Sequence, residues 1–330
     1  MATTNMTVLG PNPVYAYDAG FAHNGNGTTL VVADFDTGGG VSERCLLKRE
    51  PTDSDWSIVA DFTPGAFPSE AQAYFAAGRW FCARDAAGGG TELRTSTDLM
   101  TWTTVHTEAY DMRVDSVATD GTTAYLLLNR SSSNFKIIRV VNGATADVVD
   151  TATPMGAATN APTNNSQLIA GDGVVLWLSY CFHQNYYSSG AVVHLINGLD
   201  ASVAEYDFKK IADPMRMIAP RNTALPLYIL DSDSEYGSVP AVRIYRRISG
   251  VWSDTTVSYG LIKYTYRKRG VYANGYLFTQ DGGDPPTIQV LDIDTGVAYS
   301  VDVEAGITIL ENQASTFVDG TAGIVVAKDS

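Results

Sequence analysis

The sequence has few cysteines and few positively charged residues. Its cysteines, Cys45, Cys82 and Cys181, are odd in number, lie far apart and form no Cys-x-x-Cys pair. This argues against a disulfide framework and predicts buried thiols in strands. Lysine and arginine total 22 against 36 aspartate and glutamate residues, a formal net charge of −14. Such a charge repels nucleic acid and favours partners with basic surfaces.

Targeting and membrane-spanning segments are also missing. Residues 1–13 contain neither the basic stretch nor the apolar stretch of a secretory signal. No apolar run approaches the ~18 residues that would span a bilayer. We therefore expect no signal peptide, no transmembrane segment and no membrane insertion.

Motifs of several common catalytic sites are absent as well. There is no Gly-x-Ser-x-Gly turn and no P-loop. The glycine-rich segments 36–40 and 85–90 precede no helical pattern, so they indicate hairpin connections rather than phosphate loops. The four histidines lack the spacing of metal ligands: His23, His106, His183 and His194.

What the sequence does contain is an internal repeat. Seven short runs of β-branched, aromatic and aliphatic residues recur, each four to six residues long, as expected of buried strands. Their starts are 45 to 51 residues apart: Leu30, Trp80, Tyr125, Leu176, Leu227, Tyr276 and Ile324. A tight-turn signal such as Asn-Gly or Asp-Gly precedes most of them. A loop rich in glycine, serine or aspartate follows most, and then a third and a weaker fourth strand.

Four antiparallel strands in about 45–50 residues make one blade of a β-propeller. The sequence therefore predicts an all-β fold, a single seven-bladed β-propeller over 1–330, with very little helix. A six-bladed ring with an irregular seventh segment is the alternative, and a β-sandwich is the competing architecture. The seventh repeat stops after its second strand, so we expect an N-terminal closing strand within 1–12, over 5–10, to pair with the run at Ile324 and close the ring.

The segment TELRTSTDLMTW, residues 91–102, carries a serine, an aspartate and a tryptophan between the third and fourth strands of the second repeat. Ser96, Asp98 and Trp102 resemble a degenerate Asp box, the turn of sialidase-like β-propellers. The spacing is one residue short and the usual glycine is missing. Segments 51–56 and 249–252 are weaker echoes. We interpret this turn as structural: the aspartate accepts backbone N–H groups and the tryptophan packs between blades.

The same resemblance implies an alternative function, a sialidase-like or related glycoside hydrolase. The Arg-Ile-Pro motif of sialidases is absent, and the sequence assigns no tyrosine and glutamate pair. Other propeller glycosidases use carboxylates near the blade starts, and Asp18 and Asp36 lie at such places, although those enzymes have five blades. We assign no catalytic residue.

A partial calcium-loop pattern lies at 231–237. Asp231, Asp233 and Glu235 alternate along the chain, and oxygen ligands suit Ca²⁺. The glutamate expected at the twelfth position is missing and the glycine is one place late. We expect no cofactor, with Ca²⁺ at this segment as the exception to test.

The candidate binding residues lie in long loops of the third to sixth repeats, where tyrosine and small polar residues suit glycan or protein contacts. The basic run 263–269 is either a docking patch for an acidic partner or an edge strand protected by charge. The proposed contact residues are His183, Tyr186, Tyr187, Asp231, Asp233, Glu235, Tyr236, Lys263, Arg267, Lys268 and Arg269.

The chain is rich in threonine, glycine, alanine, aspartate, serine and tyrosine and poor in lysine. In this style it resembles propeller-type virion proteins of tailed bacteriophages. The resemblance implies a non-enzymatic structural or binding protein, in a tail appendage, a receptor-facing part or a capsid decoration, with other virion proteins or host-surface glycan as partners. It implies a virion location, with a cytoplasmic interaction platform as the alternative, and leaves a homo-oligomer open.

Overall fold

The described part of the chain contains β-strands and no helix, which confirms the all-β prediction. None of it forms a helix long and apolar enough to cross a membrane. In the computed structural model the described residues are 7–8, 21–24, 26–36, 42–53, 55–60, 62, 67–68, 71–131, 134–150, 167–182, 189–211, 216–218, 227–233, 241–257, 270–273, 276–280, 287–292, 297–302, 307–316 and 322–328.

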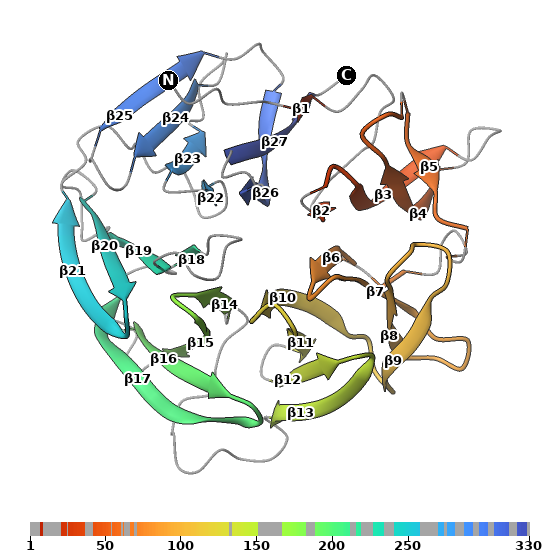
Figure 1. Ribbon diagram of the computed structural model, residues 1–330, viewed down its shortest axis with the longest axis horizontal. Helices are drawn as coiled ribbons and strands as arrows, with labels where there is room; N and C mark the ends of the chain where they lie inside the picture. The colour runs from red at the N-terminus through yellow and green to blue at the C-terminus, as the bar shows by residue number, and fades with distance from the viewer. Residues whose placement is uncertain are drawn as a thin grey trace.

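Within these residues the strands form seven sheets around a common centre (Figure 1). Six sheets have four strands in chain order, and we number them one to six; sheet seven has the order β1-β27-β26. The strands of sheets one to three are β2 (Phe21–His23), β3 (Thr29–Asp36), β4 (Ser42–Arg49), β5 (Ser57–Ile58), β6 (Ala73–Ala76), β7 (Arg79–Asp85), β8 (Thr91–Ser96), β9 (Thr103–Glu108), β10 (Arg113–Thr119), β11 (Ala124–Ser131), β12 (Asn134–Val141) and β13 (Ala144–Asp150). Those of sheets four to seven are β14 (Gln167–Gly171), β15 (Val174–Phe182), β16 (Ser189–Asn197), β17 (Asp200–Ile211), β18 (Arg216–Ile218), β19 (Leu227–Asp233), β20 (Ala241–Ile248), β21 (Val251–Val257), β22 (Gly270–Ala273), β23 (Tyr276–Gln280), β24 (Thr287–Asp292), β25 (Ala298–Asp302), β26 (Ile307–Thr316), β27 (Ala322–Lys328) and β1 (Thr7–Val8).

The seven apolar runs of the sequence are the second strands of the seven sheets, β3, β7, β11, β15, β19, β23 and β27. Where burial is described, these strands are covered on both faces; Trp80, Phe81, Cys82 and Ala83 of β7 are all buried. A strand between two neighbouring sheets needs apolar side chains at successive positions rather than at alternate ones. This explains why the second strands gave the clearest sequence signal.

The core consists of separate clusters between neighbouring sheets. Leu126 of β11 packs in the cluster shared with sheet two, whereas Leu127 packs in the cluster shared with sheet four. Successive side chains of a strand point to opposite faces, so each sheet helps to fill two clusters. Burying one such leucine contributes roughly 1.5–3 kcal/mol.

The first strand of each sheet lies nearest the centre of the ring (Figure 1). Polar groups tie some of these inner strands together. The Tyr74 hydroxyl donates to the Val114 carbonyl at 2.5 Å. The Ser116 hydroxyl both donates to the Leu168 carbonyl and accepts the Leu168 N–H, each at 3.0 Å. These bonds join sheet two to sheet three and sheet three to sheet four.

Sheet seven contains the N-terminal strand. Thr7 and Val8 of β1 pair in parallel with Val325 and Val326 of β27. β1 thus occupies the position next to β27 that the third strand holds in the other sheets. The rest of the predicted closing segment lies outside the described residues.

Candidate functional site

The connections of each four-stranded antiparallel sheet lie on two opposite sides of the ring. The first-to-second and third-to-fourth connections share one side, which we call the turn side. The second-to-third connections and the links to the next sheet share the other, which we call the loop side.

Most of those predicted residues lie outside the described part of the chain: His183, Tyr186, Tyr187, Glu235, Tyr236, Lys263, Arg267, Lys268 and Arg269. Asp231 and Asp233 are in β19, where they pair with Arg243 and Ala241 of β20. The calcium prediction stays a prediction, because Glu235 is not described.

The part of the loop side that is described best lies between sheets two and three. Tyr110, in the short link 109–112, is 64% exposed. The neighbouring loop 86–90 is fixed by two bonds, one from the Ala86 N–H to the Gly90 carbonyl and one from the Gly89 N–H to the Ala86 carbonyl, each at 3.0 Å. The link itself is anchored by buried Met112, whose N–H donates to the Thr91 hydroxyl at 3.0 Å. An aromatic ring is therefore held outward by an ordered backbone.

A polar group of side chains follows Tyr110 at the start of β10. The Arg113 guanidinium contacts an Asp115 carboxylate oxygen at 2.6 Å. The Asn129 amide of β11 donates to the other Asp115 oxygen at 2.8 Å. The pKa of the nearby Tyr74 hydroxyl is raised, first by its burial and then by the charge of Asp115. This hydroxyl therefore stays protonated and donates to the Val114 carbonyl.

Two further carboxylates belong to the loop-side ends of these segments, Asp85 at the end of β7 and Asp111 in the link 109–112. Burial, and then the charge of Asp111, raises the pKa of Asp85. Sequence reasoning missed the whole set, Tyr110, Asp111, Arg113, Asp115 and Asn129, because it favoured the long loops. The only signal available was a tyrosine and an aspartate in a link too short to bury either. We call Tyr110, Asp85, Asp111, Arg113, Asp115 and Asn129 the loop-side cluster.

On the turn side, the Ser96–Trp102 turn connects β8 and β9, as predicted. Asp98 accepts the N–H groups of Met100 at 2.9 Å and Thr101 at 2.8 Å through one carboxylate oxygen. The Ser96 hydroxyl accepts the Leu99 N–H at 2.9 Å. Leu99 takes a φ of 62°, a strained value for a residue other than glycine, and these bonds hold it there.

Trp102 ends that turn in the core between sheets one and two. Its ring meets Phe62 edge to face, with centroids 4.7 Å apart. Arg94 lies over the Phe62 ring at 5.6 Å and donates to the Trp102 carbonyl at 2.7 Å. The turn therefore fastens one sheet to the preceding one, and Asp98 and Arg94 bind its backbone groups.

The turn gives a pH-dependent prediction. The backbone N–H groups of Thr101, and then Met100, lower the pKa of Asp98 below its ordinary value. A lowered folded-state pKa contributes stability that is present above the unfolded value of about 3.9 and is lost as the pH falls through the folded value. Asp98→Ala is expected to be less stable than the parent at neutral pH and equally stable in strong acid, as measured by urea unfolding across pH. Thr97→Ala is the control, and a gap for Asp98→Ala that stays constant with pH would contradict the assignment.

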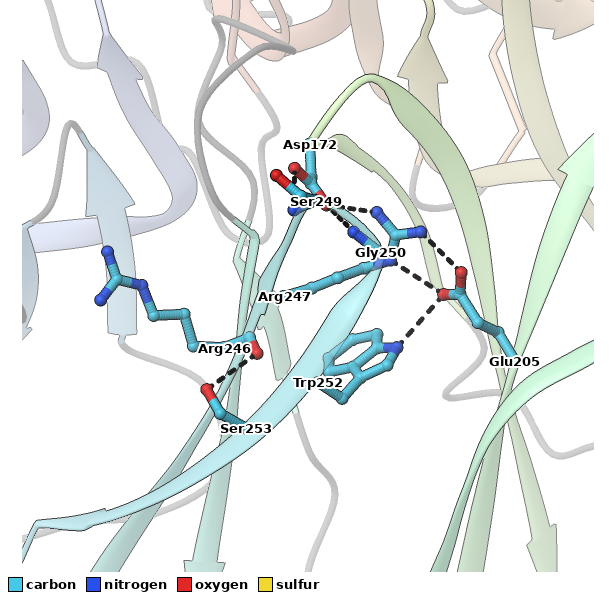
Figure 2. A network of polar contacts seen from close by, with 8 residues as sticks. All are labelled: Asp172, Glu205, Arg246, Arg247, Ser249, Gly250, Trp252 and Ser253. Atoms are coloured by element: carbon cyan, nitrogen blue, oxygen red, sulfur yellow. Dashed lines mark hydrogen bonds and ion pairs between the residues drawn. The ribbon is translucent and has the colours of Figure 1, made fainter.

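Sheets four and five are joined on the turn side by a polar network around Arg247 (Figure 2). Arg247 is 4% exposed. Its guanidinium donates to Asp172 at 2.5 Å and, through two nitrogens, to Glu205 at 2.6 and 3.0 Å. Trp252 adds a bond from its indole N–H to Glu205 at 3.2 Å. Two carboxylates thus share one buried cation.

Backbone groups complete this network. Asp172 also accepts the N–H groups of Ser249 at 2.7 Å and Gly250 at 2.8 Å. Ser249 and Gly250 form a two-residue hairpin with φ values of 50° and 81°, the turn type that suits the twist of paired strands. In the facing hairpin, between β14 and β15, Asp172 also has a positive φ, of 51°. The network therefore locks two hairpins of neighbouring sheets together.

Neither cysteine chemistry nor a metal centre is indicated by the described residues. Cys45 and Cys82 are buried free thiols, and burial raises the pKa of Cys82, which keeps it a thiol and not a nucleophilic thiolate. No group of three or more histidine, cysteine, aspartate or glutamate side chains in the described ranges is arranged to hold a metal ion.

Comparisons with known proteins identify the fold. No protein-family model matches the sequence, and no curated protein matches it. Among solved structures, the β-propeller domain of the Trilobed protease from Pyrococcus furiosus is similar, with a TM-score of 0.60 and 7% identity over 89% of this chain and 88% of that one. The Pyrococcus horikoshii acylaminoacyl peptidase has a TM-score of 0.54 and 8% identity over 88% and 47%. Saccharomyces cerevisiae Sqt1 has 0.51 and 9% over 99% and 100%.

The chain is a β-propeller. Its described residues form seven sheets around a common centre, and the similar solved structures have the same fold. At such low identity the likeness concerns the fold alone. Propellers serve unrelated functions, so function has to be argued from the chain's own sites.

Proposed function

We propose that this protein is a non-enzymatic binding propeller that contacts a glycan or a protein through its loop side. The observation that carries the proposal is Tyr110, a 64% exposed aromatic side chain on that side. Its link leads into β10, where Asp115 is bound by Arg113 and by Asn129 of β11. A tyrosine ring offers a flat apolar surface at low entropic cost, and preformed polar groups add direction. The long loops predicted from sequence would extend this surface.

Three of the described carboxylates, Asp115, Glu205 and Glu108, are paired with cations, which supports binding over catalysis by these groups. Asp115 is paired with Arg113, and Glu205 with buried Arg247. Glu108 contacts both His106 at 2.8 Å and Lys136 at 3.4 Å. A carboxylate that keeps a cation at rest is a weak proton donor or base, since the cation favours its charged form. These groups organise the fold and the surface.

We place the protein in the virion of a tailed bacteriophage, with other virion proteins or host-surface glycan as partners. The support is compositional: a net charge of −14, abundant small polar residues and little lysine. Purified phage particles are expected to contain the chain, and its recovery only as free protein in the lysate would contradict this setting.

Tyr110→Ala tests the binding function. On a glycan array the parent is expected to retain a subset of glycans without releasing sugar, and Tyr110→Ala is expected to weaken that binding on the order of tenfold, the usual loss for an aromatic anchor. Met100 is 78% exposed on the turn side. Met100→Ala is therefore the matched control and should leave glycan binding unchanged. Sugar release that disappears in Asp115→Asn would establish an enzyme instead.

A further inference from the structure

His194 of β16 lies where three sheets meet. Its ring stacks on the ring of Trp177 in β15, with centroids 4.6 Å apart and planes at 25°. The Trp177 ring is in turn 5.4 Å, between centroids, from that of Phe135 in sheet three. Trp177 and Phe135 both belong to the cluster that fills the space between sheets three and four. His194 therefore contacts the core that joins these two sheets.

The strand pairing on the other edge of β16 connects His194 to sheet five. The register between β16 and β17 shifts beside His194, which leaves Glu205 as an extra residue in β17, a β-bulge. Bulges give a side chain a new direction. Glu205 is the residue that accepts two bonds from Arg247 of sheet five, at 2.6 and 3.0 Å (Figure 2). The place of His194 in β16 is thus coupled to the contact between sheets four and five.

The surroundings of the imidazole suit its neutral form. The ring forms a hydrogen bond with the backbone of Ala201, near the start of β17. Ala201 and Trp177 are 4% and 3% exposed. Burial lowers the pKa of His194, and the bond to Ala201, a smaller influence, raises it. A cation here loses hydration that an indole ring and one carbonyl replace only in part.

The charged and titratable side chains on the elements around His194 have partners of their own. Among the described residues they are Asp172, Asp200 and Glu205 of sheet four, and Tyr125, Lys136, Arg139, Asp147 and Asp150 of sheet three. Asp200 accepts the Ser202 N–H at 2.8 Å, and Asp172 and Glu205 share Arg247. Lys136 contacts Asp147 and Asp150, each at 3.4 Å. Arg139 reaches Gly198 in the β16–β17 hairpin, and burial raises the pKa of Tyr125, which keeps its proton.

We infer that His194 is an acid-sensitive control point of the fold, whose protonation loosens the β16–β17 hairpin and the contacts of sheet four with sheets three and five. Hydration of the cation requires the ring to leave Trp177, and this movement disturbs the strands on both sides of β16. The bulge at Glu205 is next to the disturbed position, so the bonds to Arg247 weaken with it. The inference does not rest on the proposed binding function.

The pH range follows from the direction of the pKa shift. The unfolded-state pKa of histidine is about 6.5. Because the folded-state pKa of His194 is lower, the unfolded chain takes up the proton more readily between the two values. The stability that His194 contributes is therefore fully present above about pH 6.5 and is lost as the pH falls from there through the folded value. Asp98 acts only below its own unfolded value of about 3.9, so the two ranges are separate.

Urea unfolding of the full chain at about pH 7 and about pH 5 tests the inference. His194→Gln does not titrate and keeps an N–H donor for Ala201. Over this range the unfolding equilibrium constant of the parent is expected to rise roughly threefold or more beyond that of His194→Gln; the limit is about tenfold for each unit between the two pKa values. His106→Gln removes a histidine of sheet two, bound to Glu108 at 2.8 Å, and should retain the extra loss of the parent. Equal pH dependence of the parent and His194→Gln would overturn the inference.

A titration of the parent by nuclear magnetic resonance decides the matter even if His194→Gln does not fold. The His194 signal is identified by its contact with the Trp177 ring and is expected to titrate below about pH 6.5. A pKa at or above this value would mean that the indole ring stabilises the cation, and the proposed acid sensitivity would then be wrong.

Hydrogen exchange, corrected for the intrinsic effect of pH, gives the location. On acidification to about pH 5, faster exchange is expected in β16, in β17 and in the turn 249–250 of the parent, and not in the turn 97–102 of sheet two. Acceleration that leaves β16 and β17 unchanged would contradict the assignment. Glycan binding at neutral pH depends on Tyr110 and not on His194, so failure of the binding proposal is distinguishable from failure of this one.

Discussion

Replacing Arg247 with methionine is expected to lower the free energy of unfolding by about 3–5 kcal/mol, the usual cost of removing one partner of a buried ion pair. Arg247 is 4% exposed, and its guanidinium binds two carboxylates, Asp172 and Glu205. Without it these carboxylates lie close together, partly buried and without their shared cation. Their repulsion and lost solvation, rather than the loss of the attraction itself, make the change severe.

The neighbouring arginine is the matched control for that prediction. Arg246 points to the other face of β20 (Figure 2) and is less buried than Arg247. Arg246→Met is expected to cost less than Arg247→Met, as measured by urea unfolding of both variants. Adding Asp172→Asn and Glu205→Gln to Arg247→Met should recover part of the loss, because the charges left behind are then gone. A loss in Arg247→Met no larger than that in Arg246→Met would contradict the role assigned to this network.

The network around Arg247 could not be predicted from the sequence. Arg247 is 42 residues from Glu205 and 75 from Asp172 in the chain, and no periodic pattern links the three. The strands could be predicted because each carries its own signal: a buried run such as 80–83 between a tight turn and a polar loop. A contact between hairpins of different sheets depends on how the sheets pack, which a local pattern does not encode.

The proposed binding surface could not be located from the sequence either. Loop length drew attention to Tyr186, Tyr187 and Tyr236, all outside the described residues. The exposed aromatic that is described, Tyr110, is in the short link 109–112. Whether such a tyrosine turns outward depends on Met112 and Thr91, which anchor the link from below. The residue type suggested a contact, but only the packing beneath it fixed the direction.

The tryptophans of the third-to-fourth-strand hairpins connect the sequence motif to the stability of the ring. Trp56 and Trp102 lie just before β5 and β9, and Trp252 is in β21. Trp56 and Trp102 are 7% and 4% exposed. Trp102 packs against Phe62, and Trp252 binds Glu205, each in the segment or sheet that precedes its own. An arginine of the third strand accompanies both, Arg94 and Arg247 respectively. The repeated tryptophan and arginine thus join each of these hairpins to the preceding sheet. The resemblance to an Asp box concerns only the residue pattern of the turn.

Trp102→Ala is accordingly expected to destabilise the protein by about 3–5 kcal/mol, the cost of removing a large aromatic side chain from a core. The lost ring leaves a cavity between sheets one and two and removes the edge-to-face contact with Phe62, whose centroid is 4.7 Å away. Met100→Ala is the matched control in the same turn; because that side chain is 78% exposed, its effect should stay within about 0.5 kcal/mol. Unfolding in urea, followed by tryptophan fluorescence and by circular dichroism, measures both. If Trp102→Ala costs no more than Met100→Ala, the turn does not fasten the two sheets. If it costs the expected amount while glycan binding by the folded variant persists, the turn side carries stability and the loop side carries recognition, as proposed from the buried position of Trp102 and the exposed position of Tyr110.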